Sequence, residues 1–252
     1  MAKRRAISRE DKALEPKNLP HLYQTLVPLL PERHGSLRLG TKKAFDFAAR
    51  ANAVPLTAEE FPIALRHYPI VFSLGDNPSP LALVGAQLGK NDFVTNDGTW
   101  RAGTYIPAYL RRYPFAYVRE DAESTRNILC ADLSSTLFTP NEQESRPLFE
   151  NGESAQVIND ALTFCNRFEI AMERTRAATK EFLDHDLIGA STVSITRGGK
   201  VTKVEGFQTI SEEKLRELSD DVLASFVRRG LSGIMHAHFM SLANFSDLGS
   251  SV

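Results

Sequence analysis

Apolar residues recur every three or four positions between residues 154 and 183, and this spacing predicts one long amphipathic helix. At about 1.5 Å per residue the helix would be about 45 Å long. It would then either break or extend to a partner surface, although burial against the chain's own core is the commoner use of such a face. The residues predicted to face the core are Val157, Ala161, Phe164, Cys165, Phe168, Ala171, Met172, Thr175, Ala178 and Phe182, and those predicted to face solvent are Asn159, Asp160, Asn166, Arg167, Glu173, Arg174 and Lys180.

Before this helix the pattern is typical of short strands separated by turns. Runs of β-branched and aliphatic residues at 68–74 and 81–88 flank the stretch 75–80, which is rich in glycine, asparagine and proline. Such a stretch forms turns and cannot continue a strand ladder. Further strands are predicted at 115–118 and 127–133.

Short helices and a tight turn are predicted among these strands. Thr57 and Glu60 have the spacing of a capping box, in which each side chain satisfies a backbone N–H at the start of a helix. Pro107 suits the first position of a second helix, which Pro114 ends. Asn96-Asp97-Gly98 is the strongest short hairpin signal in the chain.

After the long helix, the pattern predicts a second hairpin and then a block of helices. Gly189 is expected to end the long helix. Alternating runs at 191–197 and 200–210 are joined by Gly198-Gly199, which predicts two paired strands. Short helices follow from Ser211, from Ser219 or Asp220, and over 231–243.

Tight hairpins followed by a late block of helices predict an α+β fold with a mostly antiparallel sheet, one long helix and a C-terminal helical block. Residues 1–18 are polar and are expected to form a flexible tail. Residues 19–252 are expected to form a single domain, with a sub-boundary in the polar, turn-rich stretch 134–152 as an alternative.

The chain has 252 residues, 42% of them hydrophobic, and this is enough for a substantial core. Its net charge is −1, which argues against a nucleic-acid partner because phosphate backbones are bound through excess positive charge. The charged start has no apolar run behind it, so no cleaved signal peptide is expected. No apolar stretch is long enough to span a membrane. A cytoplasmic location is therefore expected, with export by an uncleaved signal left open.

Cysteine and histidine positions predict neither a metal site nor a cofactor. Cys130 and Cys165 lie in apolar runs without ligand spacing and are expected to be buried, reduced thiols. His236 and His238 are two residues apart in a predicted helix, where that spacing corresponds to about 200° of rotation. Their rings should therefore point apart, with His238 toward the core and His236 outward.

The candidate binding site is a cluster of arginine and aromatic residues between the predicted hairpin and the second short helix. Guanidinium groups bind carboxylate or phosphate and aromatic rings supply stacking, so the cluster predicts a site for a peptide, a protein or an anionic small molecule. The alternative is a structural cluster in which the arginines meet internal carboxylates or carbonyls. The predicted ligand-binding residues are Trp100, Arg101, Tyr105, Arg111 and Arg112.

Several stretches give the chain a resemblance to a known bacterial family. They are HYPIVFSL, NDGTWRAGTYIPAYLRRYPFAYV, PLFENGE, GFQTISEEKLRELSDD and HAHFMSLANFSDL. With these the chain resembles the SapC family, named from an association with surface-layer protein loci, over residues 19–248. A similarly named peptide-transporter permease has membrane spans and is a different protein.

The resemblance implies a cellular role but no specific reaction, because no catalytic residues can be carried over from the family. Genes of the family are associated with outer-membrane nutrient uptake and with flavin-dependent halogenase-like proteins. The resemblance therefore implies an accessory or binding protein of surface-layer or uptake systems. Separately from the resemblance, a homo-oligomer is left open. The alternative is an enzyme that modifies a small molecule or a peptide, with metal dependence left open.

Overall fold

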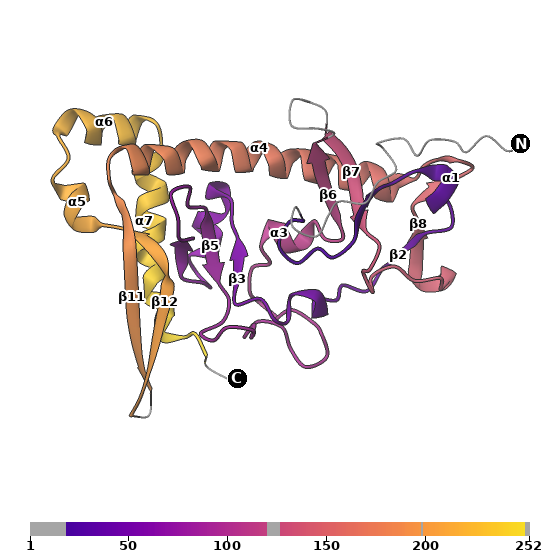
Figure 1. Cartoon of the computed structure of the whole chain (residues 1–252), viewed down its shortest axis with the longest axis horizontal. Coiled ribbons are helices and arrows are strands. Elements are labelled where there is room, and N and C mark those ends of the chain that lie inside the picture. Colours follow the sequence, from indigo (N-terminus) through magenta and orange to yellow (C-terminus); the bar gives the residue numbers. More distant parts are fainter. Residues whose placement is uncertain (1–18, 120–126, 198, 250–252) are drawn as a thin grey trace, which may run out of the picture. The chain divides into compact units, whose positions relative to one another are not determined.

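The computed structural model of the chain describes residues 19–119, 127–197 and 199–249, and it has the predicted α+β fold (Figure 1). By their contacts, the described residues form two compact units. The first unit combines the residues up to Phe47 with Arg112–Glu169, and the second combines Ala48–Arg111 with the residues from Ile170 onward. The expectation of a single domain stays a prediction, and the tail predicted at 1–18 lies outside the described residues.

The first unit contains an antiparallel sheet in the order β1-β7-β6, with β1 at Leu26–Pro28, β7 at Asn127–Asp132 and β6 at Phe115–Arg119. The polar, turn-rich stretch 134–152, named above as an alternative sub-boundary, contains short strands as well as turns. The remaining elements of this unit are α1 (Pro31–His34), β2 (Arg38–Gly40) paired with β8 (Ser145–Pro147), η5 (Glu142–Glu144), and β9 (Phe149–Glu150) paired with β10 (Glu153–Ser154), while η3 (Asp46–Ala48) lies where the chain enters the second unit.

The second unit contains an antiparallel sheet in the order β11-β12-β4-β5-β3. Both predicted strands at 68–74 and 81–88 form, but they are shorter than predicted, as β4 (Ile70–Phe72) and β5 (Pro80–Leu83). The remaining elements are β3 (Ala53–Pro55), η4 (Ala58–Glu60), α2 (Phe61–Ala64), α3 (Ala108–Arg111), β11 (Ile188–Arg197), β12 (Lys200–Ile210), α5 (Glu212–Arg216), α6 (Asp220–Arg228), α7 (Leu231–Ser241) and η6 (Leu242–Ser246).

The predicted long helix forms without a break as α4, Gln156–Asp184. Eight of the ten residues predicted to face the core are buried, the other two (Phe164 and Met172) are half-buried, and all seven predicted solvent-facing residues are exposed. In the first unit, residues of α4 pack against side chains of β6 and β7 in one apolar cluster. In the second unit, Ala178 and Phe182 join a different cluster with residues of α6 and α7.

The helix α4 ends before Gly189, so the prediction that this glycine stops the helix is wrong. Gly189 lies inside β11, where it pairs with Thr209. The left-handed residue after the helix is Asp186, with φ of 54°, and the amide of Leu187 donates to the carbonyl of Phe182 across the same turn. Aspartate tolerates this conformation better than most residues, so it replaces the expected glycine.

The predicted hairpin after the helix forms as β11 and β12, which pair in antiparallel register from Ile188↔Ile210 to Arg197↔Lys200. The ladder shifts between Ser191 and Val193. Side chains on one face of the hairpin, including Val204 and Phe207, pack with Phe245 and Leu248 in an apolar cluster. The hairpin is therefore held to the second unit by one face.

His238 and His236 on α7 point apart, as predicted: His238 is fully buried and His236 is exposed. The free cysteines Cys130 and Cys165 are buried, which confirms that prediction too. Burial raises the pKa of Cys130 to about 12 and that of Cys165 to about 11, so both remain protonated thiols at neutral pH.

Candidate functional site

Four of the five predicted ligand-binding residues belong to the second unit, and Arg112 belongs to the first. Arg112 is buried, with its Nη1 atom 3.3 Å from Oε1 of Glu169. Its guanidinium carbon lies 4.5 Å from the centre of the Phe168 ring. A buried guanidinium that meets a carboxylate and an aromatic face has the surroundings expected of a structural ion pair.

Tyr105 connects Arg111 to a buried carboxylate in the second unit. Its hydroxyl donates to Oε1 of Glu60 over 2.9 Å, and Nη2 of Arg111 donates to that hydroxyl over 2.9 Å. Burial, and then the negative charge of Glu60, raise the pKa of Tyr105 to about 12, although Arg111 acts in the opposite direction. Arg111 itself is exposed and also donates through Nε to the carbonyl of Ile106 over 2.9 Å.

Glu60 is the centre of this network, and the predicted capping box explains half of it. Its Oε2 accepts from the backbone N–H and the hydroxyl of Thr57, over 2.8 and 2.9 Å. Its Oε1 accepts from Tyr105 and, over 2.7 Å, from the N–H of Ala108 at the start of α3. The cap of one helix therefore also fixes the start of another, 48 residues later in the chain.

Trp100 and Arg101 pack around Phe93 at the predicted hairpin, which forms as a single bridge between Val94 and Trp100. The Trp100 and Phe93 rings stack with centroids 5.8 Å apart. The guanidinium carbon of Arg101 lies 4.6 Å from the Phe93 ring centre, and its Nη2 donates to the carbonyl oxygen of Asp92 over 2.6 Å. The aromatic cluster thus fixes the backbone that carries Asp92.

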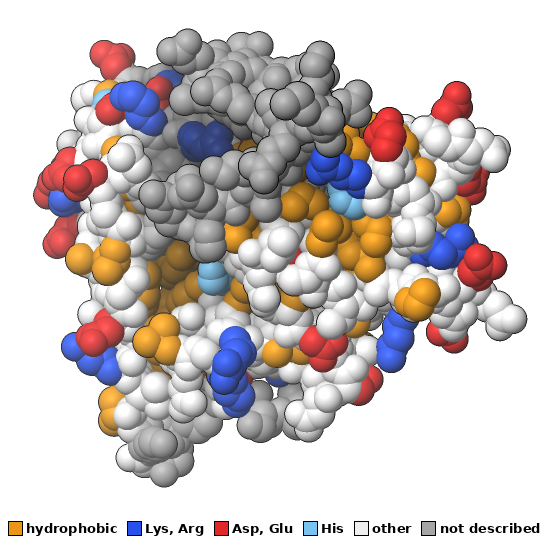
Figure 2. All heavy atoms as spheres, turned by 45° about the vertical axis from the view of Figure 1, so that its right-hand side comes forward, with side chains coloured by type: hydrophobic (Ala, Val, Ile, Leu, Met, Phe, Trp, Pro, Cys, Tyr) orange, Lys and Arg blue, Asp and Glu red, His pale blue; other side chains and the backbone are white. Residues whose placement is uncertain are grey.

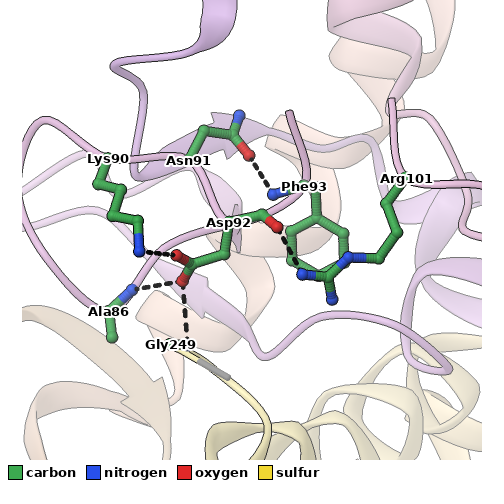
Figure 3. Close-up of polar contacts among 7 residues, drawn as sticks. All are labelled: Ala86, Lys90, Asn91, Asp92, Phe93, Arg101 and Gly249. Atoms are coloured by element: carbon green, nitrogen blue, oxygen red, sulfur yellow. Dashed lines mark hydrogen bonds and ion pairs between the residues drawn. The ribbon is translucent and has the colours of Figure 1, made fainter. Parts of the chain in front are cut away.

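Asp92 lies in a cavity that the sequence did not single out. Its Oδ1 is 3.2 Å from Nζ of Lys90, and its Oδ2 accepts from the N–H of Gly249 over 3.0 Å and from that of Ala86 over 3.4 Å (Figure 3). The Asp92 side chain is only 7% exposed, whereas that of Lys90 is 55% exposed. The cavity has a volume of about 210 Å³ and is lined by Ala86, Gln87, Lys90, Asp92, Ile195, Thr202, Leu248 and Gly249.

The turn that carries Lys90 depends on a glycine. A Cβ atom added to Gly85 would lie 2.0 Å from the carbonyl oxygen of Lys90, a distance that no side chain permits. The N–H of Asp92 donates to the carbonyl of Val84 over 2.7 Å, which closes the turn. Leu88 at its tip is 91% exposed. The close approach at Gly85 therefore constrains the backbone of Lys90.

A second cavity of about 600 Å³ lies in the same unit, between the turn after β4 and the last turns of α4. Lys180 and Asp184, which line it, form an exposed ion pair with each other. Its lining mixes both signs of charge: Asp76, Asn77, Pro78, Ser79, Arg176, Thr179, Lys180, Leu183 and Asp184. In the first cavity the two charges differ in exposure, because the Asp92 carboxylate is buried and the Lys90 side chain is exposed.

Charges of both signs are interspersed over the face seen in Figure 2, between groups of apolar side chains. Within the described ranges, no group of three or more histidine, cysteine, aspartate or glutamate residues is arranged to hold a metal ion. In the same residues no helix combines the length and apolar character needed to cross a bilayer.

A family model described as SapC matches residues 29–248. The chain belongs to the SapC family. Searches of curated proteins and of solved structures each found no match. The matched range includes the residues that line the Lys90–Asp92 cavity as far as Leu248, and it includes all five predicted ligand-binding residues.

The sequence predicted one residue that contacts the backbone at this cavity, Arg101, but it did not predict the charged pair of Lys90 and Asp92. Arg101 was predicted, and it fixes the backbone of Asp92 from behind. No pattern in the sequence indicated Lys90 or Asp92 as site residues. The Asp92 carboxylate is held by backbone amides of Ala86 and Gly249, and backbone groups of this kind leave no motif in a sequence. The ligand-binding role of Trp100, Arg101, Tyr105, Arg111 and Arg112 stays a prediction.

Proposed function

We propose that this SapC-family chain is an accessory binding protein that holds a peptide or a small anionic molecule by a carboxylate in the Lys90–Asp92 cavity. The single observation behind this proposal is the unequal exposure of the ion pair. The Asp92 carboxylate is nearly buried and is contacted by the N–H groups of Ala86 and Gly249 and by the Lys90 ammonium. The Lys90 side chain, in contrast, is 55% exposed at the cavity. The pair therefore presents a positive group to a ligand.

The chemistry of the pair favours an anion over a cation. Asp92 needs no ligand, because two backbone amides and Lys90 already surround its carboxylate. The Lys90 ammonium has three N–H donors, and one of them is directed at the Asp92 carboxylate. The remaining donors can bind a carboxylate, which forms charge-assisted hydrogen bonds that are stronger than neutral ones.

The size and walls of the cavity limit what the carboxylate can belong to. A volume of about 210 Å³ is below the range of drug-sized sites, which begins at about 300 Å³. Ile195 and Leu248 supply apolar wall, while Thr202 and Gln87 supply polar groups. A small acid or the last residue of a peptide suits such a site better than a larger cofactor.

The cellular part of the proposal has separate support. The proposed role in surface-layer or nutrient-uptake systems is supported by the resemblance to the SapC family. We propose a cytoplasmic location with it. The alternative of an enzyme that modifies a small molecule or a peptide, with metal dependence left open, stays a prediction of the sequence. Metal analysis of protein purified without an affinity tag addresses it, because stoichiometric zinc or iron would favour an enzyme.

Calorimetric titration with matched probes tests the proposal. The probes are N-acetylated dipeptides with a free carboxylate and the same dipeptides as C-terminal amides. Loss of one charge-assisted hydrogen bond should weaken binding of the amides at least about tenfold. Equal binding of acids and amides, or no binding of either, would contradict the proposal.

A further inference from the structure

The five-stranded sheet of the second unit has two different edges. The strand β3 at one end is three residues long and ends in Pro55, which is a common way to keep a sheet edge from pairing. The strand β11 at the other end is ten residues long and has no proline. Among the described strands β11 pairs only with β12 (Figure 1).

The register shows which backbone groups of β11 face away from the sheet. The N–H of Ser211 donates to the carbonyl of Leu187 over 2.8 Å, so Leu187 points its carbonyl toward β12. Backbone direction alternates along a strand. The odd-numbered residues of β11 therefore bond to β12, and the outward groups are those of Ala190, Thr192, Ser194 and Thr196.

The irregularity in the hairpin leaves this outer edge regular. Ser191 pairs with Phe207 and Val193 pairs with Val204, so the extra residue is in β12. Gly206 in β12 has φ of 89°, as expected at a bulge of this kind. A bulge in an edge strand would discourage pairing, but here it lies in the inner strand.

From this geometry we infer that the outer edge of β11 pairs with the same edge of a second copy, as a two-fold symmetric dimer with one sheet continuous across both copies. Antiparallel pairing centred on Val193 sets Thr192 of each copy opposite Ser194 of the other, and Ala190 opposite Thr196. The four outward residues of each copy then form about eight backbone hydrogen bonds across the axis.

The side chains of β11 suit a second copy of the same strand. Ala190, Thr192, Ser194 and Thr196 are all exposed, small and uncharged, so no like charges meet. Pairs of threonine and serine across strands are favourable. Arg197, the single charged residue of β11, falls opposite Gly189 in this register. The strand is complementary to itself, and this is what selects a second copy over another extended segment.

Sedimentation of the full chain over a range of concentrations, followed for wild type and variants, tests the inference. The wild type should be a dimer in equilibrium with monomer. Ser194→Pro removes an outward N–H without removing a bond to β12, so it should give a monomer whose Tm stays within a few degrees. A wild type that is monomeric at every concentration, or a dimer that survives Ser194→Pro, would overturn the inference.

A matched pair of double variants tests the register without proline. T192E/S194E sets glutamates opposite each other across the axis and should weaken the dimer about tenfold or more. T192K/S194E sets lysine opposite glutamate and should leave the dimer as strong as wild type or stronger. Equal dimerisation of the two variants would show that these residues do not meet, and would overturn the proposed pairing.

Discussion

The imidazole of His238 donates through Nδ1 to the carbonyl oxygen of Ile70, with the two atoms 2.8 Å apart. The direction follows from the other ring nitrogen, because Nε2 accepts the N–H of Ile210 over 3.2 Å. Ile70 belongs to β4 and Ile210 to β12, two strands whose own register contains only the pair Gln208↔Phe72. The neutral His238 ring therefore links β4 to β12, two strands that share only one pair of residues in their own register.

This arrangement predicts a loss of stability in acid. Burial lowers the pKa of His238 to about 4, whereas the unfolded chain keeps the ordinary value of 6.5. The unfolded state then binds the proton more readily, so the contribution of His238 is present above pH 6.5 and is lost as the pH falls toward 4. Between pH 7 and pH 5 the free energy of unfolding should fall by on the order of 2 kcal/mol from this group.

Urea unfolding at the two pH values measures that loss. In His238→Asn the difference between pH 7 and pH 5 should shrink by about the same amount, while the exposed neighbour His236→Asn should behave as wild type. An unchanged pH dependence in His238→Asn would show that another group titrates.

Glu60→Gln should lower the free energy of unfolding by about 2 to 4 kcal/mol. The amide would direct an NH₂ group at donors that now approach the carboxylate from Thr57, Tyr105 and Ala108. Glu59→Gln is the control, because Glu59 forms an exposed pair with Arg174 and should change stability by less than about 1 kcal/mol. Equal effects of the two changes in urea unfolding would mean that Glu60 does not organise this region.

Alanine variants of Arg111 and Arg112 should differ in stability. Arg112→Ala leaves Glu169 without its buried partner and should cost about 3 kcal/mol. Arg111 is exposed, so Arg111→Ala should keep the Tm within a few degrees. Thermal unfolding measures both. Comparable destabilisation by the two changes would contradict the different roles that their surroundings indicate.

The same Arg111→Ala protein tests the predicted ligand-binding cluster. If carboxylates bind at Lys90, this variant should bind the acid dipeptides within about threefold of wild type, since it does not line that cavity. Abolished binding would instead place the ligand at the cluster of Trp100, Arg101, Tyr105, Arg111 and Arg112.

Gly85→Ala should displace the turn that carries Lys90. The added Cβ would lie 2.0 Å from the Lys90 carbonyl oxygen, and the backbone must move to relieve this contact. Binding of acid dipeptides should be lost, and stability should fall by about 2 kcal/mol. Gly189→Ala is the control, because nothing lies within 4 Å of its added Cβ and its φ is not positive. If calorimetry showed equal binding by both variants, the turn would not set the site.

Much of the fold could be predicted because its signals are local or periodic. The two faces of α4 follow from spacing alone, and the hairpin of β11 and β12 follows from alternation around two glycines. The capping box at Thr57 and Glu60 formed as predicted. In each case the residues that interact are close in sequence, so their spacing carries the information.

The parts that could not be predicted depend on contacts between distant residues. Glu60 and Tyr105 are 45 residues apart, Asp92 and Gly249 are 157 apart, and Ile70 and His238 are 168 apart. No spacing in the sequence indicates such pairs. The sequence also could not show that Arg112 differs from the other predicted site residues. Its partner, Glu169 on α4, is far from it in the sequence.

The most direct test of the account is a calorimetric titration of N-acetyl-alanyl-alanine, with its free carboxylate, into wild type, Lys90→Gln and Lys43→Gln. Lys43 is an exposed lysine that does not line the cavity, so it controls for the loss of one charge. The account predicts that Lys90→Gln weakens binding at least about tenfold while Lys43→Gln changes it less than about twofold. Equal binding by all three proteins would contradict the claim that Lys90 holds the ligand's carboxylate.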